Sequence, residues 1–397
     1  MKRTRYLIIA AITLSLSAGI YAGEINNRGV TKKTAGNYTL VWQDNFDGNV
    51  LNEETNWNIE TDGEGNGNRE LQYYKRENLS IGKEPVSGEN CLIITAKKEK
   101  YSGKECTSGR ITTQNKMTFT FGKIEARIKL PKTANGLWPA FWLLGADFPA
   151  VGWPRSGEID ILEMGHTDGI RDNTQDRLFN GACHWGYYQP EGWFPSHAQH
   201  KINPYTLQDD DFHLYTLIWD NESIRMYLDM DKYPDASPYY ELGLTSRDSD
   251  ISPYYYFNKP FFVILNLAIG GNFTQIWDIN KITALNAGDA YMYVDYVRVY
   301  QKGDEGEEYN GPKLEAGIKP EYSSGSSLIY PNPATDYICI KSEDKARKVY
   351  ITSLYGQKVM SLSDPDCIDI SPLSSGHYIV KILEGNGQQT VSQLIKR

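Results

Sequence analysis

Three carboxylates stand close together in the stretch GEIDILEMG, at Glu158, Asp160 and Glu163. The residues between them, including Ile159 and Ile161, are apolar, which is typical of a packed β-strand. Acids that share a groove serve either to bind a hard cation or to cleave a glycosidic bond. A calcium loop is usually richer in Gly, Asn and Asp. A solvated acidic face is disfavoured, because like charges on one strand repel and the surrounding sequence is aromatic.

The spacing of the acids conflicts with a regular strand. Successive strand residues face opposite sides, so Glu158 and Asp160 share a face and Glu163 should face away. A β-bulge adds one residue to a strand and shifts the alternation by one. We therefore predict a bulge at Ile161–Leu162, which returns Glu163 to the face of the other two acids.

The crowding of the acids also predicts their chemistry. Three adjacent carboxylates cannot all stay ionised at low energetic cost, so at least one pKa should rise. A protonated acid can then protonate a leaving oxygen while an ionised partner attacks the anomeric carbon. Retaining glycosidases hold these groups about 5 Å apart and inverting ones hold them further apart. The backbones of Glu158 and Glu163 should lie roughly 13 Å apart, which permits either stereochemistry.

The elements that position the acids are expected to be strands. Between residues 38 and 301 the sequence alternates or runs through short apolar stretches, punctuated by Gly, Asn, Asp and Pro. This pattern, without a long amphipathic helix, predicts one large all-β sandwich or barrel domain. The stretches that carry it are LVWQDNF, CLIITAKKE, GKIEARIKL, FHLYTLIWD, SIRMYLD, PFFVILNLAI and MYVDYVRVY.

Composition narrows the class of ligand. The 397 residues include 28 Tyr, 12 Phe and 9 Trp, which either fill a wide β core or stack on sugar rings. The net charge of −9 argues against nucleic acid or anionic lipid as a partner, because both require a basic surface.

The N-terminus has the pattern of a secretory signal. Lys2, Arg3 and Arg5 precede the apolar run Leu7–Leu16, and Ala22 offers a cleavage point. We predict a signal peptide over residues 1–22 and no transmembrane segment in the mature protein. The residue directly after the cleavage point is not a cysteine, so a lipid anchor is not expected.

The C-terminal part predicts a linker and a second domain. Residues 302–327 are rich in Gly, Glu, Lys, Pro and Ser, typical of a solvated linker. Residues 328–397 alternate like a small β-sandwich. YPNPATDYICI, SLYGQKV, DISPLSSGHYIVKI and the final LIKR resemble the C-terminal sorting domain of the type IX secretion system of Bacteroidetes. The alternative, a carbohydrate-binding module, is disfavoured because this tail contains no Trp. The resemblance implies a secreted or cell-surface protein that engages the type IX machinery.

The five cysteines leave their pairing open. They are Cys91, Cys106, Cys183, Cys339 and Cys367, and their spacing matches no zinc motif. An oxidising compartment would permit a Cys91–Cys106 or a Cys339–Cys367 bridge.

The larger domain carries a second resemblance. NGLWPAFWLLG, GWPRSGEIDILEMGH, LNLAIGGNF and VDYVRVY, between about Val41 and Tyr300, resemble glycoside hydrolase family 16, in particular its laminarinase-like endo-β-1,3-glucanases. The resemblance implies a β-jelly-roll with a concave cleft and a retaining mechanism. Glu158 would be the nucleophile, Glu163 the general acid/base and Asp160 a helper that tunes their protonation. Relatives with a regular E-x-D-x-E strand lack the extra residue.

The same resemblance implies substrate-binding residues. The set is Asn68, Arg110, Trp138, Trp142, Trp153 and His184. From local sequence alone each has a structural alternative: core packing for Trp142, a satisfied strand histidine for His184, turn chemistry for Asn68 and a surface ion pair for Arg110. His213, in FHLYTLIW, is expected to be structural.

The resemblance also implies a structural calcium site remote from catalysis, at Asn45, Gly88 and Asp295, and no cofactor for the reaction itself. Several relatives have an acid at the position of Asn45. The leading hypothesis is a monomeric secreted enzyme acting on β-1,3 or mixed-linkage β-1,3/1,4 glucan. An algal galactan hydrolase of the same fold and a non-catalytic glucan-binding module are the alternatives. The intact acids argue against the module, and a sulfated substrate would favour basic residues beside the acids, which the sequence lacks.

Overall fold

The computed structural model describes residues 38–314, 328–341, 346–353, 358–384 and 389–397. The predicted signal peptide and the second half of the predicted linker lie outside these residues. Within them, strands dominate, and the longest helix is the six-residue α2 (Thr167–Asp172). The expected all-β class is confirmed.

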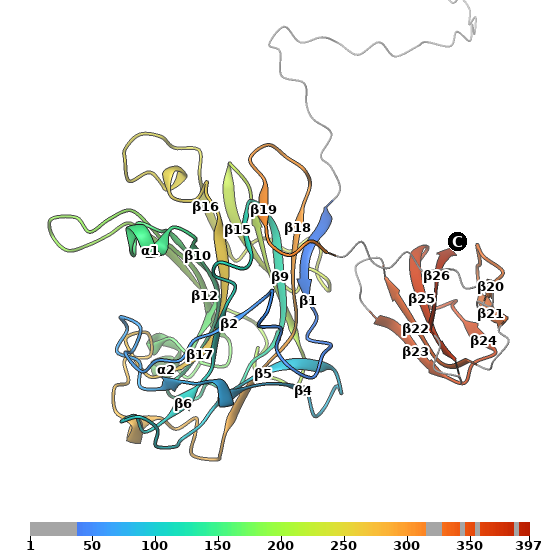
Figure 1. Ribbon diagram of the computed structural model, residues 1–397, viewed down its shortest axis with the longest axis horizontal. Coiled ribbons are helices and arrows are strands. Elements are labelled where there is room, and N and C mark those ends of the chain that lie inside the picture. The colour runs from blue at the N-terminus through green and yellow to red at the C-terminus, as the bar shows by residue number, and fades with distance from the viewer. Residues whose placement is uncertain (1–37, 315–327, 342–345, 354–357, 385–388) are drawn as a thin grey trace, which may run out of the picture. The chain divides into compact units, whose positions relative to one another are not determined.

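The larger domain contains two sheets, and the first is named sheet A. Its eight strands among the described residues are β1 (Thr39–Asp44), β4 (Leu79–Lys83), β5 (Asn90–Ala96), β9 (Gly122–Lys129), β14 (His213–Trp219), β15 (Ser223–Leu228), β16 (Tyr240–Gly243) and β18 (Ala290–Gln301). Their order is β16–β15–β14–β9–β18–β5–β4, and β1 pairs with β18 (Figure 1).

The second sheet, sheet B, carries the acids. In the described part of the chain its nine strands are β2 (Asn58–Ile59), β7 (Arg110–Thr112), β8 (Thr118–Thr120), β10 (Leu137–Gly145), β11 (Glu158–Met164), β12 (Leu178–His184), β13 (Ser196–Ile202), β17 (Phe261–Ile269) and β19 (Glu308–Asn310). Their order is β13–β12–β11–β10–β17–β7–β2, with β8 beside β17 and β19 beside β8.

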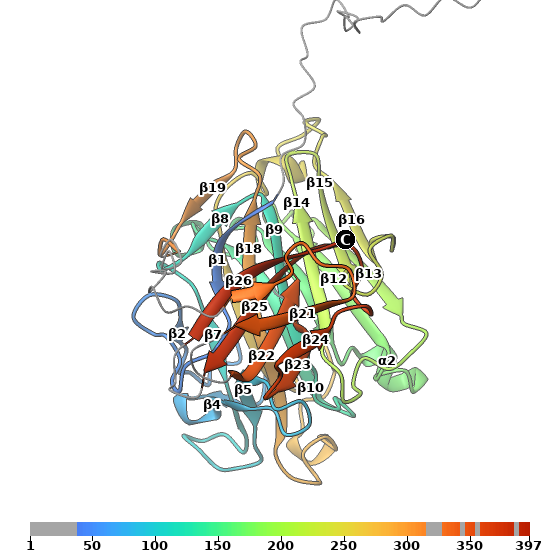
Figure 2. The same ribbon diagram turned by 90° about the vertical axis from the view of Figure 1, so that its right-hand side faces the viewer.

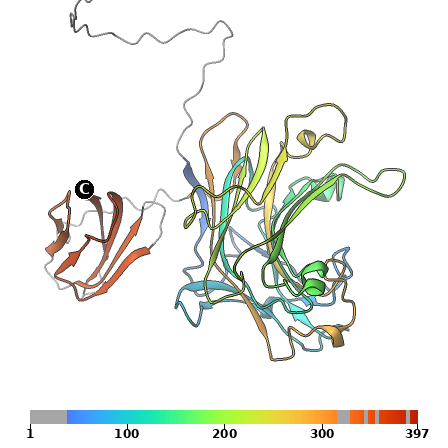
Figure 3. The same ribbon diagram turned by 180° about the vertical axis from the view of Figure 1, so that it is seen from behind.

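Short elements complete the larger domain. They are β3 (Tyr73–Tyr74), which pairs in parallel with β6 (Thr107–Ser108), the helices α1 (Phe148–Val151) and α2, and the 3-10 turns Arg76–Asn78, Pro253–Tyr255 and Ile279–Lys281. Figures 1 and 3 show the two layered sheets of this domain from opposite sides.

The hydrophobic core lies between the two sheets. Ile124 and Ile128 of β9 enter it from sheet A, and Ile159 and Ile161 of β11 enter it from sheet B, all with no exposed surface. Burying one such side chain stabilises the fold by roughly 1.5–3 kcal/mol. Because alternate residues of a strand face opposite sides, the outer face of sheet B is free to carry polar groups.

The larger domain extends past the predicted linker boundary at residue 302. Glu308–Asn310 forms β19 and pairs with β8. The carboxylate of Glu307 accepts hydrogen bonds from three backbone N–H groups, of which Lys302 is the first, so it closes a turn. Glycine and glutamate in this stretch therefore serve a turn rather than a solvated linker.

The C-terminal domain is a small two-sheet unit, as predicted. One sheet contains β20 (Leu328–Tyr330), β21 (Tyr337–Lys341) and β24 (Cys367–Asp369), and the other contains β22 (Ala346–Ser353), β23 (Lys358–Ser363), β25 (Gly376–Glu384) and β26 (Gln389–Lys396) (Figure 2). Ile338, Val349, Ile351, Val380 and Ile382 fill the core that both sheets share.

One of the two proposed disulfides is present. Cys339 and Cys367 face each other on β21 and β24 and are bonded. Cys91, Cys106 and Cys183 are free and buried, so the alternative Cys91–Cys106 bridge is not formed. All three free thiols lie within the core of the larger domain or beside it, away from solvent.

Candidate active site

Strand β11 departs from regular pairing at the predicted place. On the β10 side the pairing passes from Asp160 directly to Leu162, which leaves Ile161 as the extra residue. On the β12 side the register shifts between Asp160 and Glu163. Ile161 and Leu162 both face the core without exposed surface. The predicted bulge is confirmed, and it returns Glu163 to the face of the other acids.

Glu163 is held by two hydrogen-bond donors. Trp138 Nε1 on β10 donates to Glu163 Oε1 at 3.0 Å, and Asn180 Nδ2 on β12 donates to Oε2 at 2.9 Å. Asn180 lies directly opposite Glu163 in the β11–β12 register and is only 2% exposed. Each carboxylate oxygen therefore has its own partner, which fixes the orientation of the group.

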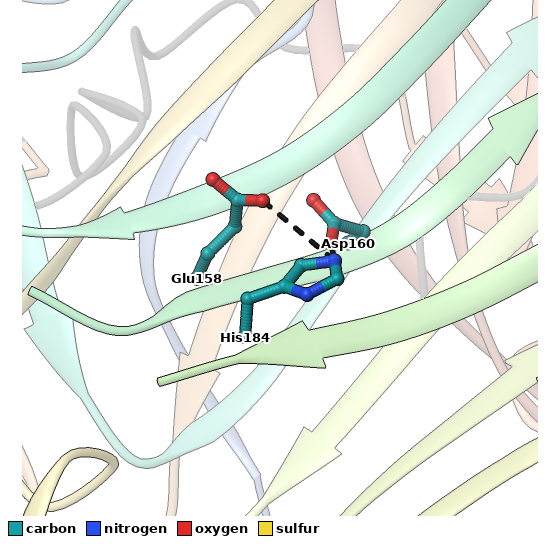
Figure 4. A group of neighbouring side chains, drawn as sticks. All are labelled: Glu158, Asp160 and His184. Carbon is teal, nitrogen blue, oxygen red and sulfur yellow. Dashed lines mark ion pairs between the residues drawn. The ribbon is translucent and has the colours of Figure 1, made fainter. Parts of the chain in front are cut away.

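Glu158 has one indole donor and one nearby imidazole. Trp153 Nε1 donates to Glu158 Oε2 at 3.1 Å. His184, directly opposite on β12, places its Nε2 4.0 Å from Glu158 Oε1. One oxygen of Glu158 is thus tied to an indole and the other points toward His184 (Figure 4).

Asp160 lies between the two glutamates and is the least satisfied of the three acids. It is 5% exposed, and its Oδ2 has no hydrogen-bond partner within the described chain. His184 Nε2 lies 3.5 Å from that oxygen. Figure 4 shows the imidazole directed at Asp160 and Glu158.

Burial raises the pKa of all three acids, because desolvation penalises their charged forms. Repulsion from Glu163 further raises the pKa of Glu158, and both glutamates raise that of Asp160. A hydrogen bond from Trp153 lowers the pKa of Glu158, and hydrogen bonds from Trp138 and Asn180 lower that of Glu163. Burial lowers the pKa of His184 to about 4. The three carboxyl groups therefore tend to hold protons near neutral pH, while the imidazole of His184 is neutral.

Arg110 lies over the ring of Trp142 beside the acids. The Arg110 guanidinium lies 5.1 Å from the centre of the Trp142 ring and pairs with Glu60 at 2.7 Å. Trp142 Nε1 donates to Asn266 at 2.7 Å. Trp142 also packs on an apolar patch of the same sheet face. Arg110 thus forms the ion pair, and Trp142 the packing contact, that local sequence suggested. Both residues nevertheless lie beside the acids.

Asn68 lies in a loop that reaches the Trp138 side of the site. Its backbone oxygen accepts the N–H of Asn272, and its side chain is partly exposed. The next residue, Phe273, stacks on Trp138 at 4.7 Å with an interplanar angle of 9°. The structure thereby connects the predicted Asn68 loop to the tryptophan that holds Glu163.

Aromatic rings surround Trp153 on the other side of the site. Phe194 lies 4.5 Å from Trp153 and Tyr188 lies 6.0 Å from it, measured between ring centres. Both come from the segment between β12 and β13. Sequence reasoning missed Asn180, Phe194, Tyr188 and Phe273. Only the alternation of β12, which puts Asn180 and His184 on one face, offered a signal.

The predicted calcium set engages arginines instead. Arg298 Nη2 donates to Asn45 Oδ1 at 3.0 Å, and Arg127 Nη1 lies 2.6 Å from Asp295 Oδ2. Gly88 lies in the turn between β4 and β5. In this arrangement the two side-chain oxygens do not fit a calcium ion.

Family profiles match both domains. The profile described as Glycosyl hydrolases family 16 matches residues 48–239, and the profile described as Secretion system C-terminal sorting domain matches residues 328–397. None of the helices in the described residues is long and apolar enough to cross a membrane.

Curated relatives differ in how much of their length this chain covers. The Beta-glucanase of Rhodothermus marinus is 32% identical over 306 residues, which are 76% of this chain and 95% of the relative. The Clotting factor G alpha subunit of Tachypleus tridentatus is 35% identical over 268 residues, which are 66% of this chain but only 34% of that protein.

Solved structures share the fold of the larger domain. The GH16 protein of the Bacteroides ovatus mixed linkage glucan PUL, in complex with G4G4G3G product, is 35% identical with a TM-score of 0.55 and covers 64% of this chain and 98% of its own. The catalytic domain of an endo-1,3-beta-glucanase (laminarinase) from Thermotoga petrophila RKU-1 is 33% identical with a TM-score of 0.53 and covers 68% and 100%. The bulged acid strand, the sheet order and these matches show that the chain belongs to glycoside hydrolase family 16 and is a secreted or cell-surface glycoside hydrolase.

Proposed function

We propose that the chain hydrolyses internal bonds of β-glucan with retention of configuration, at β-1,3 linkages or at β-1,4 linkages beside them. The observation that carries this proposal is the placement of Glu158 and Glu163 on one face of sheet B, each held by a tryptophan N–H on either side of Asp160. The relatives named as a beta-glucanase and a laminarinase, and the neighbour solved with a mixed-linkage product, support the substrate class.

In the first step Glu158 acts as the nucleophile. Its ionised oxygen forms a bond to the anomeric carbon as the bond from that carbon to the leaving oxygen breaks. Glu163 donates its proton to the leaving oxygen, so the departing glucan carries a hydroxyl group. A glycosyl ester on Glu158 and an ionised Glu163 remain.

In the second step Glu163 acts as the base. It takes a proton from a water molecule whose oxygen attacks the anomeric carbon and releases Glu158 as a carboxylate. Two inversions give net retention. Asp160, with no donor at Oδ2, retains a proton and limits the negative charge beside the nucleophile.

Substrate is needed to place the proton on Glu163. In the free protein Glu163 accepts two hydrogen bonds and Glu158 accepts one, so the anion of Glu163 is the better stabilised of the two. A glycosidic oxygen can only accept a hydrogen bond. A bound glucan therefore favours the protonated form of the carboxyl group it touches, which the proposed roles require of Glu163.

Product analysis tests the substrate class. Purified protein is incubated in parallel with laminarin, barley β-glucan, agarose and carrageenan. We expect a ladder of oligosaccharides from the first two and none from the galactans. A ladder from agarose or carrageenan alone would instead support a galactan hydrolase. Binding of glucan without release of reducing sugar from any polymer would indicate a glucan-binding module.

Covalent trapping tests the roles of the two glutamates. A 2-deoxy-2-fluoro glucoside with a dinitrophenolate leaving group should accumulate as an ester on the nucleophile, because loss of the hydroxyl slows both steps. Peptide mass spectrometry should locate the label at Glu158. A label at Glu163 would reverse the assignment, and release of the α-anomer as the first product would replace retention by inversion.

We further propose that the protein acts as a monomer and that the sorting domain engages type IX secretion machinery. The matched profile over residues 328–397 supports the second statement. Light scattering during size-exclusion chromatography should give a mass near the 45.1 kDa of the full chain, less the cleaved signal. A dimer mass would contradict the first statement, and unchanged export after deletion of residues 328–397 would contradict the second.

A further inference from the structure

Glu158, Asp160 and His184 present three ligand atoms to one point. One oxygen or nitrogen from each lies within 4.8 Å of the other two. His184 Nε2 is 3.5 Å from Asp160 Oδ2 and 4.0 Å from Glu158 Oε1. Figure 4 shows the three groups converging from β11 and β12. Because Glu158 and His184 are direct partners in the sheet, the backbone fixes this convergence.

The convergence leaves a buried oxygen unpaired. Only 5% of the surface of Asp160 is exposed. Its Oδ2, which is directed at His184, has no hydrogen-bond partner in the described chain. His184 Nδ1 is also unpaired there. A buried polar atom without a partner costs about 1–3 kcal/mol. A cation that accepts electron pairs from all three ligands would remove this penalty at Asp160 Oδ2.

We propose that these three side chains bind a borderline divalent cation such as Zn²⁺ or Cu²⁺, which inhibits the enzyme by excluding the glucan. The binding itself depends only on the three ligands. The inhibition rests on the proposed role of Glu158 in hydrolysis.

The donor set selects this class of cation. Zinc sites take imidazole nitrogen at about 2.0–2.1 Å and carboxylate oxygen at about 2.0–2.2 Å, which places tetrahedral donors roughly 3.3–3.5 Å apart. The 3.5 Å pair already meets this spacing, and the 4.0 Å pair needs only a small rotation of Glu158. Trp153 holds the other oxygen of Glu158 and leaves Oε1 directed at the point.

Other cations fit less well. Calcium takes six to eight oxygen ligands and magnesium retains several waters, whereas an imidazole with two carboxylates suits zinc and copper. Three protein ligands also leave a fourth position for water, as in open zinc sites. A glucan that reaches Glu158 must occupy the same space, so cation and substrate should exclude each other.

Calorimetry with the full-length, tag-free protein tests the binding. Titration with zinc chloride should give one site per chain, and affinity should fall at least tenfold in Asp160→Asn and in His184→Gln. The matched control is His200→Gln, because His200 and His166 form a neighbouring imidazole pair with ring centres 4.6 Å apart. This control should bind zinc as the wild type does. Circular dichroism confirms that each variant is folded, and His184→Gln, which alters a partly exposed residue, serves if Asp160→Asn does not fold.

Copper spectroscopy and kinetics separate the remaining outcomes. The electron paramagnetic resonance spectrum with one equivalent of Cu²⁺ should show coupling to a single imidazole nitrogen. Coupling to two, or loss of binding in His200→Gln alone, would assign the metal to the other pair and overturn the proposal, as would absence of stoichiometric binding. Zinc should raise the KM for laminarin and leave kcat unchanged. Stoichiometric binding by a protein that cleaves no β-glucan would preserve the metal site and refute the proposed function instead.

Discussion

Two aspartate–histidine pairs, one on each sheet of the catalytic domain, each contain a buried aspartate but differ in their hydrogen bonds. On sheet A, His213 Nδ1 lies 2.8 Å from Asp229 Oδ2, and the N–H of Leu214 donates to the other oxygen at 2.8 Å. On sheet B, His184 Nε2 lies 3.5 Å from Asp160 Oδ2, which has no hydrogen-bond partner among the described residues. Both aspartates are at least nine-tenths buried.

The pKa values of the two pairs shift in opposite directions. Burial lowers the pKa of His213, but the hydrogen bond and the charge of Asp229 more than offset this effect, so the pKa is raised. Burial raises the pKa of Asp229, but the contact with His213 outweighs it, so the pKa is lowered. Burial raises the pKa of Asp160 and lowers that of His184 to about 4. The surroundings of the sheet A pair therefore favour its ionised form, whereas those of the sheet B pair favour its neutral form. Because both aspartates are buried, the hydrogen bonds that each aspartate accepts separate the two pairs.

The largest expected effect is on turnover. Glu158→Gln should lower kcat on laminarin by about 10⁴-fold or more, because the covalent step has no nucleophile. Asp229→Asn, corrected for its folded fraction, should keep kcat within about threefold of wild type, because it lies outside the acid cluster. Initial rates of reducing-sugar release measure both, and a loss of turnover in Asp229→Asn equal to that of Glu158→Gln would break the comparison.

The next effect separates stability from chemistry. Asp229→Asn should reduce the free energy of unfolding by about 3–5 kcal/mol, because it leaves a buried histidine without its counter-ion. Asp160→Asn removes no hydrogen bond in the described chain and should change that free energy by less than about 1 kcal/mol, while lowering kcat/KM by about 100-fold. Urea unfolding followed by tryptophan fluorescence reports on the catalytic domain, because every Trp lies there. Equal destabilisation by both variants would contradict the distinction.

Asn180→Ala tests the donors on Glu163. Loss of one of two hydrogen bonds should lower kcat by about tenfold, which corresponds to about 1.4 kcal/mol. Because this bond lowers the pKa of Glu163, its removal should raise that pKa and move the basic limb of the kcat profile to higher pH. If Asn180 had only a structural role, Asn180→Ala would lower the melting temperature and leave the basic limb of the kcat profile unchanged. Asn180→Asp would not serve as a control, since it adds a fourth acid.

The smallest effect is a difference in the pH dependence of stability. His213 has a raised folded pKa, so its contribution is fully present below the unfolded pKa of about 6.5 and is lost as pH rises through the folded pKa. His184 has a lowered folded pKa of about 4, so the fold loses stability as pH falls from about 6.5 toward 4. At pH 5, relative to pH 8, His213→Gln should therefore destabilise and His184→Gln should stabilise, each by about 1 kcal/mol. Melting temperatures at the two pH values measure this, and shifts of the same sign would refute the assigned charge states.

Alternation along single strands made part of the site predictable. The spacing of Glu158, Asp160 and Glu163 was sufficient for the bulge, because strand facing depends only on local sequence. Asn180 escaped notice because its role depends on which residue of β12 pairs with Glu163. Phe273 and Trp138 are 135 positions apart in sequence and stack because β10 and β17 are neighbours, a pairing that no local pattern specifies.

Two further expectations concern polar residues whose partners lie elsewhere in the chain. The linker was expected to begin at residue 302 because Gly and Glu are common there, but three backbone donors turn Glu307 into a turn-closing residue and Tyr309 packs on the core. The side-chain oxygens of the expected calcium set contact arginines. Asn45 accepts from Arg298, and Asp295 on β18 pairs with Arg127 on β9. In both cases polar residues form contacts with other parts of the chain, which composition does not predict.

The extra residue in β11 also bears on how such an active site is inherited. Loss of one codon at Ile161–Leu162 would leave the second glutamate two places after Asp160, and alternation would keep it on the same face. A lineage can therefore gain or lose this residue without passing through an ancestor that lacks the acid cluster. What changes is the number of branched side chains packed beneath the acid, which is two in this chain. Natural selection can thus adjust the support and reach of Glu163 by an insertion while the three carboxylates stay in place.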